Sequence, residues 1–207
     1  MVPRRAIPSP AVRAVLATGA LLMAAAAPAA PDPAALTRRL VAAAVERAHL
    51  KVRYVGDYVR IPYPGGDVPA DTGVCADEVI RIYRAVGVDL QVAVHEDIVR
   101  APSAYPLRGR PDTSIDHRRV KNLLVYFRRD GEVLPITGDP TDYGPGDLVV
   151  WDLVAGHIGM VVDRKDPASG RPLILHNVGR GPMIEDVLFT WPILGHFRYR
   201  GPRASPR

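Results

Sequence analysis

Hydrophobic residues recur with a helical period in the first half of the chain and form short continuous runs in the second half. Asp32 followed by Pro33 is typical of a helix start, since aspartate caps a helix and proline fits its first turn. The apolar positions that follow share one helical stripe and predict a helix over residues 33–49: Leu36, Leu40, Val41, Ala44 and Ala48.

A second helix is predicted to begin near residue 75, which places Cys75 in its first turn. Residues 54–73 before it are rich in proline and glycine and predict an irregular loop. Either Asp71 or Thr72 could cap the helix. Apolar residues then recur at spacings of four and three until Gly87 ends the helix: Val79, Tyr83 and Val86.

The remaining pattern predicts mainly strands. Residues 95–97 are expected in a loop or at a helix edge, without a chemical role. Residues 112–130 suit a helix capped by Asp116, although Val125 to Phe127 would also fit a strand. Four strands are predicted after them: residues 147–152, 157–162, 173–178 and 196–200, the second and third as a hairpin. Helices followed by strands predict an α+β fold in which N-terminal helices pack on a small antiparallel sheet.

Residues 1–30 have the pattern of a secretory signal peptide: a basic start, a charge-free apolar stretch and small residues with prolines at its end. That stretch is short for a membrane span, and no second one follows. We therefore expect an exported monomer, periplasmic or extracellular, with one domain over residues 31–207 and no membrane span after signal removal. Removing the signal lowers the formal charge from +5 to +2, which gives no argument for a nucleic-acid partner.

Cys75 is the only cysteine, so it cannot form a disulfide within the chain. In an oxidising compartment, such a residue is a buried apolar side chain, half of an intermolecular disulfide or a reactive thiol. A zinc site formed with His157 and His176 is a further alternative, although the short paired spacing common in such sites is absent. The predicted helix start favours a reactive thiol, because the helix dipole stabilises the thiolate.

Two histidines on predicted core strands are candidate partners of the thiol. His157 opens one strand, and His176 lies in the next, beside Asn177. A buried imidazole costs free energy unless it is paired, and Gly159, on the same strand face as His157, leaves room for another ring. If the strands are adjacent, His176 or Asn177 could orient His157, which would give a nucleophile, a base and an orienter.

Four short motifs resemble the bacterial NlpC-type cysteine peptidases, a group of the papain-like superfamily that cleaves peptidoglycan stem peptides. The motifs are Cys75 at a helix start, the tyrosine and glycines of residues 63–66, the PGDLV of residues 145–149, and HIGMVV at 157–162 with LHN at 175–177. The resemblance spans about residues 54–200. It implies a papain-like fold, Cys75 as nucleophile, His157 as base and His176 as orienter. It also implies Tyr63 as oxyanion support, a cell-wall peptide as substrate, and no cofactor or metal.

The chain departs from that group around the thiol, where the common Asp-Cys-Ser-Gly is replaced by Val-Cys-Ala-Asp at residues 74–77. It also carries a long insert between the helix and the sheet, so it resembles a branch that is a domain of unknown function. Within the insert, His117, Arg118 and Arg119 form either a solvated helix face or a substrate site in which an arginine binds a carboxylate. The competing functions are a noncatalytic envelope-binding module of the same fold and a thiol amidase with a non-wall substrate.

Overall fold

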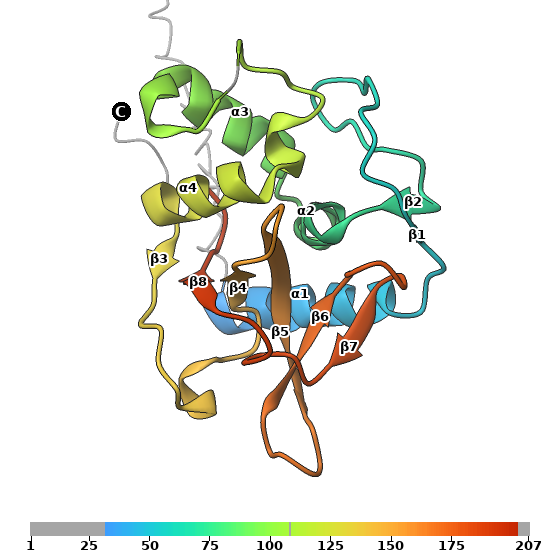
Figure 1. Ribbon diagram of the computed structural model, residues 1–207, viewed down its shortest axis with the longest axis vertical. Helices are drawn as coiled ribbons and strands as arrows, with labels where there is room; N and C mark the ends of the chain where they lie inside the picture. The colour runs from blue at the N-terminus through green and yellow to red at the C-terminus, as the bar shows by residue number, and fades with distance from the viewer. Residues whose placement is uncertain (1–31, 108, 203–207) are drawn as a thin grey trace, which may run out of the picture. The chain divides into compact units, whose positions relative to one another are not determined.

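The computed structural model in Figure 1 describes residues 32–107 and 109–202. The predicted signal peptide, residues 1–30, lies outside the described residues. The described residues belong to one compact unit. Among them, no helix has the length and apolar character needed to cross a membrane.

The described residues form an α+β fold with four α-helices. The helices are α1 (Pro33–Arg47), α2 (Cys75–Ala85), α3 (Leu90–Arg100) and α4 (Val120–Asp130). Short 3-10 turns occupy Pro102–Ala104, Asp116–Arg118 and Pro140–Asp142. The helix predicted from residue 33 is confirmed, with the Asp32 carboxylate accepting a hydrogen bond from Ala34 N–H at 3.0 Å.

Three local predictions need correction. Residues 95–97 lie inside α3 and not in a loop, because Asp89 caps this helix by accepting from Gln91 N–H at 2.9 Å. Neither Asp71 nor Thr72 caps α2, whose N-cap is Val74. In the uncertain segment over residues 112–130, Asp116 begins a 3-10 turn and α4 starts only at Val120.

The main sheet has six antiparallel strands in the order β3-β8-β4-β5-β6-β7. Figure 1 shows β3 at one edge and β7 at the other. The strands are β3 (Glu132–Val133), β4 (Leu148–Trp151), β5 (His157–Lys165), β6 (Pro172–His176), β7 (Met183–Glu185) and β8 (Ile193–Arg198). The antiparallel sheet and its four central strands were predicted, whereas β3 and β7 were not. A separate parallel pair joins β1 (Arg53–Tyr54) to β2 (Thr72–Gly73).

Residues of β5 alternate between two apolar layers. Ile158, Met160 and Val162 belong to a large core that contains the buried faces of α1, α2, α3 and α4. Val161 belongs to a smaller cluster that includes Trp151. His157 pairs with Trp151 across the ladder and stacks on its ring at 5.5 Å between centroids. His157 therefore lies on the face of the sheet that the smaller cluster covers.

Candidate active site

Cys75 is the first residue of α2, and only 3% of it is exposed. Burial raises the pKa of its thiol to about 11, although the backbone N–H groups of Ile158, Ala76 and Cys75 itself act in the opposite direction. The contact with Ile158 places the sulfur against the strand residue that directly follows His157. At neutral pH the resting side chain is thus a protonated thiol, and it needs a base to become a nucleophile.

A hydrogen-bonded chain of three side chains crosses β5, β6 and β7. His157 Nε2 lies 3.0 Å from His176 Nδ1, and His176 Nε2 lies 3.0 Å from Glu185 Oε2. A carboxylate only accepts, so His176 donates to it from Nε2 and has a lone pair on Nδ1. His157 then donates from Nε2, which leaves its Nδ1 as a free acceptor. The chain fixes the tautomer in which His157 can take a proton.

The surroundings keep His157 neutral. Burial, together with the smaller effect of the His176 charge, lowers its pKa to about 4. Trp151 and Trp191 flank the ring, each with its centroid 5.5 Å away. At Gly159 an added Cβ would lie 2.7 Å from Leu175 O and 3.2 Å from His176 Cβ, so glycine permits the close approach of the two strands. A neutral imidazole is the form that can accept the thiol proton.

The thiol and the imidazole open onto neighbouring cavities that share a wall. Cys75 lines a cavity of about 720 Å³, and His157 lines one of about 630 Å³. Both cavities are bordered by the same four residues: Tyr54, Lys121, Ala155 and Gly156. No hydrogen bond joins Cys75 to His157 in the resting structure. Proton transfer would therefore require a movement that brings the sulfur, which packs in the large core, to the His157 ring, which packs against Trp151.

Of the two proposed orienters, the structure brings His176 to His157 and not Asn177. Asn177 Oδ1 accepts from Gly179 N–H at 3.2 Å, and its buried Nδ2 has no partner. Tyr63 is also displaced from the expected position: its ring packs edge-on against His95 at 5.3 Å, and it lines neither cavity. The tyrosine beside the thiol is Tyr54, whose pKa rises mainly through burial and further through the Cys75 charge.

Arg118 and Arg119 were the two candidates for binding a substrate carboxylate, and Arg118 already binds a carboxylate of the protein. Arg118 Nε and Nη2 donate to Asp77 at 2.7 and 3.0 Å, in a pair whose side chains are 3% and 2% exposed. Asp77 also accepts from Val74 N–H at 2.7 Å, so this pair fixes the first turn of α2. His117 is buried, with its Nδ1 unpartnered and its pKa lowered to about 4 by burial. Carboxylate binding stays a prediction, which the structure narrows to Arg119.

The insert between helix and sheet lines the cavity next to the thiol. Three exposed cations stand on this wall, and in the described part of the chain none of them has an ion-pair partner: Arg110, Arg119 and Lys121. We call them the cavity cations. Asp112 and Asp116 lie on the same wall. The cavity is therefore a mixed site in which unpaired positive charge faces the space beside Cys75.

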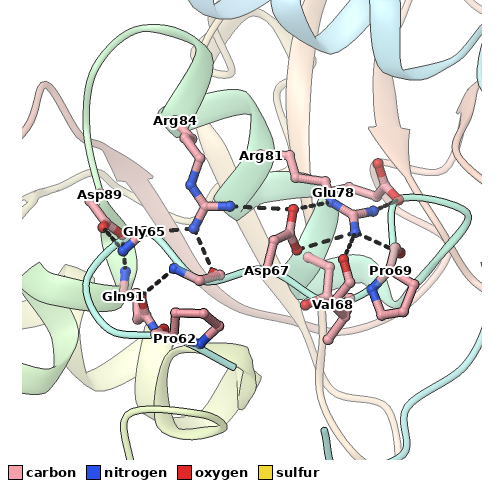
Figure 2. Close-up of polar contacts among 12 residues, drawn as sticks. Pro62, Gly65, Asp67, Val68, Pro69, Glu78, Arg81, Arg84, Asp89 and Gln91 are labelled. Carbon is pink, nitrogen blue, oxygen red and sulfur yellow. Dashed lines mark hydrogen bonds and ion pairs between the residues drawn. The ribbon is translucent and has the colours of Figure 1, made fainter. Parts of the chain in front are cut away.

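A second basic group holds the loop that leads to the thiol (Figure 2). Arg81 binds Asp67 at 2.9 Å and the carbonyl oxygens of Val68 and Pro69 at 3.3 Å. Arg84 donates to Gly66 O at 3.0 Å and lies 3.3 Å from Asp67. We call residues 54–73 the approach loop, and Arg81 and Arg84 the anchoring arginines, because they fix this loop to α2.

Gln91 completes the anchor from α3, as Figure 2 also shows. Its side chain accepts from Gly66 N–H at 2.9 Å and donates to Pro62 O at 2.8 Å. A Cβ at Gly66 would lie 2.0 Å from Pro62 O, so only glycine fits there. The approach loop is thus held by hydrogen bonds from its backbone to Gln91 and by ion pairs of Asp67 with Arg81 and Arg84.

Three residues of the site were missed from sequence: Tyr54, Asp77 and Glu185. Glu185 ends the short strand β7, and its alternation with Ile184 was the available signal for an inward-facing carboxylate. Asp77 occupies the third helical position, where a carboxylate often caps. Among residues 32–107 and 109–202, no group of three or more His, Cys, Asp and Glu side chains could hold a metal ion.

Comparisons with known proteins place the chain in a family. The family described as Domain of unknown function (DUF1287) matches residues 41–199. The chain is 49% identical over 147 residues to the Uncharacterized protein YijF of Escherichia coli (strain K12). The aligned region covers 69% of this chain and 71% of the relative. No solved structure matches it. Since the family match runs from α1 to the end of β8 and includes every residue of the site, the chain belongs to the family Domain of unknown function (DUF1287).

Proposed function

We propose that this protein is an exported cysteine hydrolase with a papain-like fold of the NlpC type. It cleaves amide bonds in the stem peptides of peptidoglycan through an acyl-enzyme on Cys75. The observation that carries the proposal is the Glu185–His176–His157 chain, which presents an unprotonated imidazole nitrogen next to the strand residue that contacts the sulfur.

In the proposed reaction, His157 Nδ1 takes the proton from the thiol as the sulfur attacks the substrate carbonyl carbon. The negative charge that develops on the carbonyl oxygen is stabilised by the N-terminal amide groups of α2. Collapse of the tetrahedral intermediate breaks the C–N bond, and His157 returns the proton to the leaving amine. Water then hydrolyses the thioester, with His157 again acting as base.

The substrate class follows from the cavity beside Cys75. Stem peptides carry several carboxylates, and the unpaired cavity cations offer them charge-assisted hydrogen bonds. Tyr54 and Tyr58, which are 45% and 58% exposed, add aromatic surface at the same cavity. A cavity of about 720 Å³ accommodates a short peptide.

The direct test is digestion of purified peptidoglycan, with the released fragments weighed by mass spectrometry. The wild-type protein should release peptide fragments, and Cys75→Ala should release none. Release by both proteins would remove Cys75 from the reaction. If no wall fragment appears although the thiol is activated by His157, the substrate is a different amide and the peptidoglycan assignment fails.

One observation favours a second function, a noncatalytic envelope-binding module of the same fold. The thiol is buried, and burial raises its pKa to about 11, whereas catalytic thiols usually have a lowered pKa. A binding module would cosediment with peptidoglycan equally well as wild type and as Cys75→Ala, and it would leave the wall intact.

A further inference from the structure

We propose that Glu185 and Arg180 act as opposing positioning residues that set where the positive charge lies once the thiol is ionised, with His176 and not His157 as its final holder. This inference rests on the proposed function, because it concerns the proton that His157 takes from Cys75. It goes beyond an orienting role, in which a side chain only holds the base in place.

His176 links two partners through its two ring nitrogens: His157 at Nδ1 and the Glu185 carboxylate at Nε2, each at 3.0 Å. An asparagine at this position could accept a hydrogen bond from His157 but could not accept its proton. A histidine can do both, and here a carboxylate lies directly behind it.

The proton balance can be written atom by atom. The Sγ–H bond of Cys75 breaks, and its proton joins Nδ1 of His157. The Nε2–H bond of His157 breaks, and that proton joins Nδ1 of His176. The products are a thiolate, a neutral His157 protonated at Nδ1, and a His176 imidazolium hydrogen-bonded to Glu185. When the leaving amine takes the proton from His157 Nδ1, the proton on His176 Nδ1 returns to His157 Nε2.

The surrounding charges favour His176 as the holder. Burial lowers the pKa of His176, but the hydrogen bond and charge of Glu185 act against that effect, whereas at His157 burial and the repulsion of His176 both lower the pKa. The carboxylate sits on the side of His176, one ring farther from the thiol. A positive charge is therefore more stable next to Glu185 than between the two tryptophans.

Arg180 opposes Glu185. It binds the other carboxylate oxygen, Oε1, at 2.8 Å from the loop between β6 and β7, and its charge lowers the pKa of His176. The other charged or titratable groups near the pair are Lys121, Asp152 and Tyr54, which line the cavity that His157 borders, and Cys75, which lines the neighbouring cavity. Among the residues that the structure describes, Glu185 and Arg180 are the two charged side chains bonded into the chain beyond His176.

The opposition predicts effects of opposite sign on thiol ionisation, measured as the iodoacetamide alkylation rate of the whole protein between pH 5 and 10. Glu185→Gln should raise the apparent pKa of the alkylation profile by about one unit, which is a tenfold loss of rate below the midpoint. Arg180→Ala should lower the apparent pKa and raise the rate about threefold, a smaller change because Arg180 is largely exposed.

A double variant separates action through His176 from a general field effect. In a His176→Asn background, Glu185→Gln should cause no further loss of rate, because the carboxylate acts only through that ring. Asp186→Asn is the matched control: Asp186 follows Glu185 directly but is bonded to Arg171 and Ser169, so its loss should leave the profile unchanged.

The inference is overturned if Glu185→Gln alkylates like the wild type, or if Arg180→Ala shifts the profile in the same direction as Glu185→Gln. Should Glu185→Gln fail to fold, Arg180→Ala at its exposed site still tests the inference, because a rise in the apparent pKa of its alkylation profile would contradict it. The proposed function and the role of Glu185 are tested by different variants. An unchanged rate in His157→Ala removes the proposed function, whereas a slowed His157→Ala beside an unchanged Glu185→Gln removes only the role of Glu185.

Discussion

The anchoring arginines and the cavity cations are two basic groups on the same chain with opposite surroundings. Arg81 and Arg84 bind a carboxylate and backbone carbonyl oxygens of the approach loop. The cavity cations, Arg110, Arg119 and Lys121, line the space beside Cys75 without an ion-pair partner in the described chain. Positive charge that is already satisfied stabilises the backbone, whereas positive charge left open at a cavity remains available to a ligand.

The same contrast applies within residues 117–119. Arg118 is buried against Asp77 and belongs to the structural group, whereas Arg119, the next residue, is exposed on the cavity wall. Neighbours in sequence therefore differ in role because the 3-10 turn over Asp116–Arg118 points them in different directions. A substitution in the structural group should therefore change stability, whereas one among the cavity cations should change ligand binding.

The largest effect is expected from Cys75→Ala. If the cavity is an active site, hydrolysis of peptidoglycan fragments should fall by at least about 10³-fold, because the nucleophile is lost. Fragment release followed by mass spectrometry measures this, and a denaturant titration should show that the folded state persists. Residual hydrolysis within a factor of two of wild type would place the reaction elsewhere.

Acid should destabilise the folded protein through two buried histidines, His157 beside the cavities and His117 beside Arg118. Burial lowers the pKa of His157 and of His117 from 6.5 to about 4, so the unfolded chain binds protons first as the pH falls. Stability is therefore complete above pH 6.5 and is lost towards pH 4, by on the order of 3 kcal/mol for each ring. Unfolding free energies between pH 7 and 4 measure the slope.

A matched variant assigns this slope. His117 lies among the charges of Asp77, Arg118, Asp89 and Arg84, and it is not bonded to the Glu185–His176–His157 chain. His117→Gln should remove its share of the acid loss and leave the alkylation of Cys75 unchanged. An acid slope equal to that of the wild type would show that His117 titrates normally.

Arg81→Ala should lower the free energy of unfolding by about 2–3 kcal/mol, because one ion pair and two hydrogen bonds to backbone carbonyls are lost in a largely buried setting. Chemical denaturation measures the change. Arg81→Lys should recover little, since a single ammonium cannot reproduce the forked contacts. A loss below about 0.5 kcal/mol would contradict the anchoring role.

Arg119→Ala has the smallest expected effect and tests the other group. We expect KM for carboxylate-bearing fragments to rise about tenfold, the cost of one charge-assisted hydrogen bond, with unchanged stability and thiol alkylation. Arg164→Ala, an exposed site on β5 outside both cavities, is the control. Equal KM values for the two variants would show that Arg119 is an ordinary solvated side chain that does not bind the substrate.

The sequence predicted the parts of the fold that have a strong local signal. The helix start at Asp32 and Pro33, the strands that carry His157 and His176, and the α+β order all follow from capping and periodicity. The sequence offered His176 or Asn177 as the partner of His157 if the two strands were adjacent, and the register of β5 with β6 selects His176.

The missed parts depend on contacts that are remote in sequence. β7 has three residues and β3 has two, too few for a period to be visible, so Glu185 could not be placed beside His176. Tyr54 reaches the thiol through the pairing of β1 with β2, which no local pattern indicates. The family resemblance implied Tyr63 at this place, yet its neighbours Gly65 and Gly66 are bonded to Asp89 and Gln91, and Tyr63 lines neither cavity.

The central claim is that an imidazole activates the lone thiol, and the most direct measurement is the alkylation rate of Cys75 by iodoacetamide at pH 7 in wild type and in His157→Ala, followed by intact mass. The account predicts rapid modification of the wild type and at least a tenfold slower reaction in the variant, with both proteins folded by circular dichroism. Equal rates in the two proteins would contradict it.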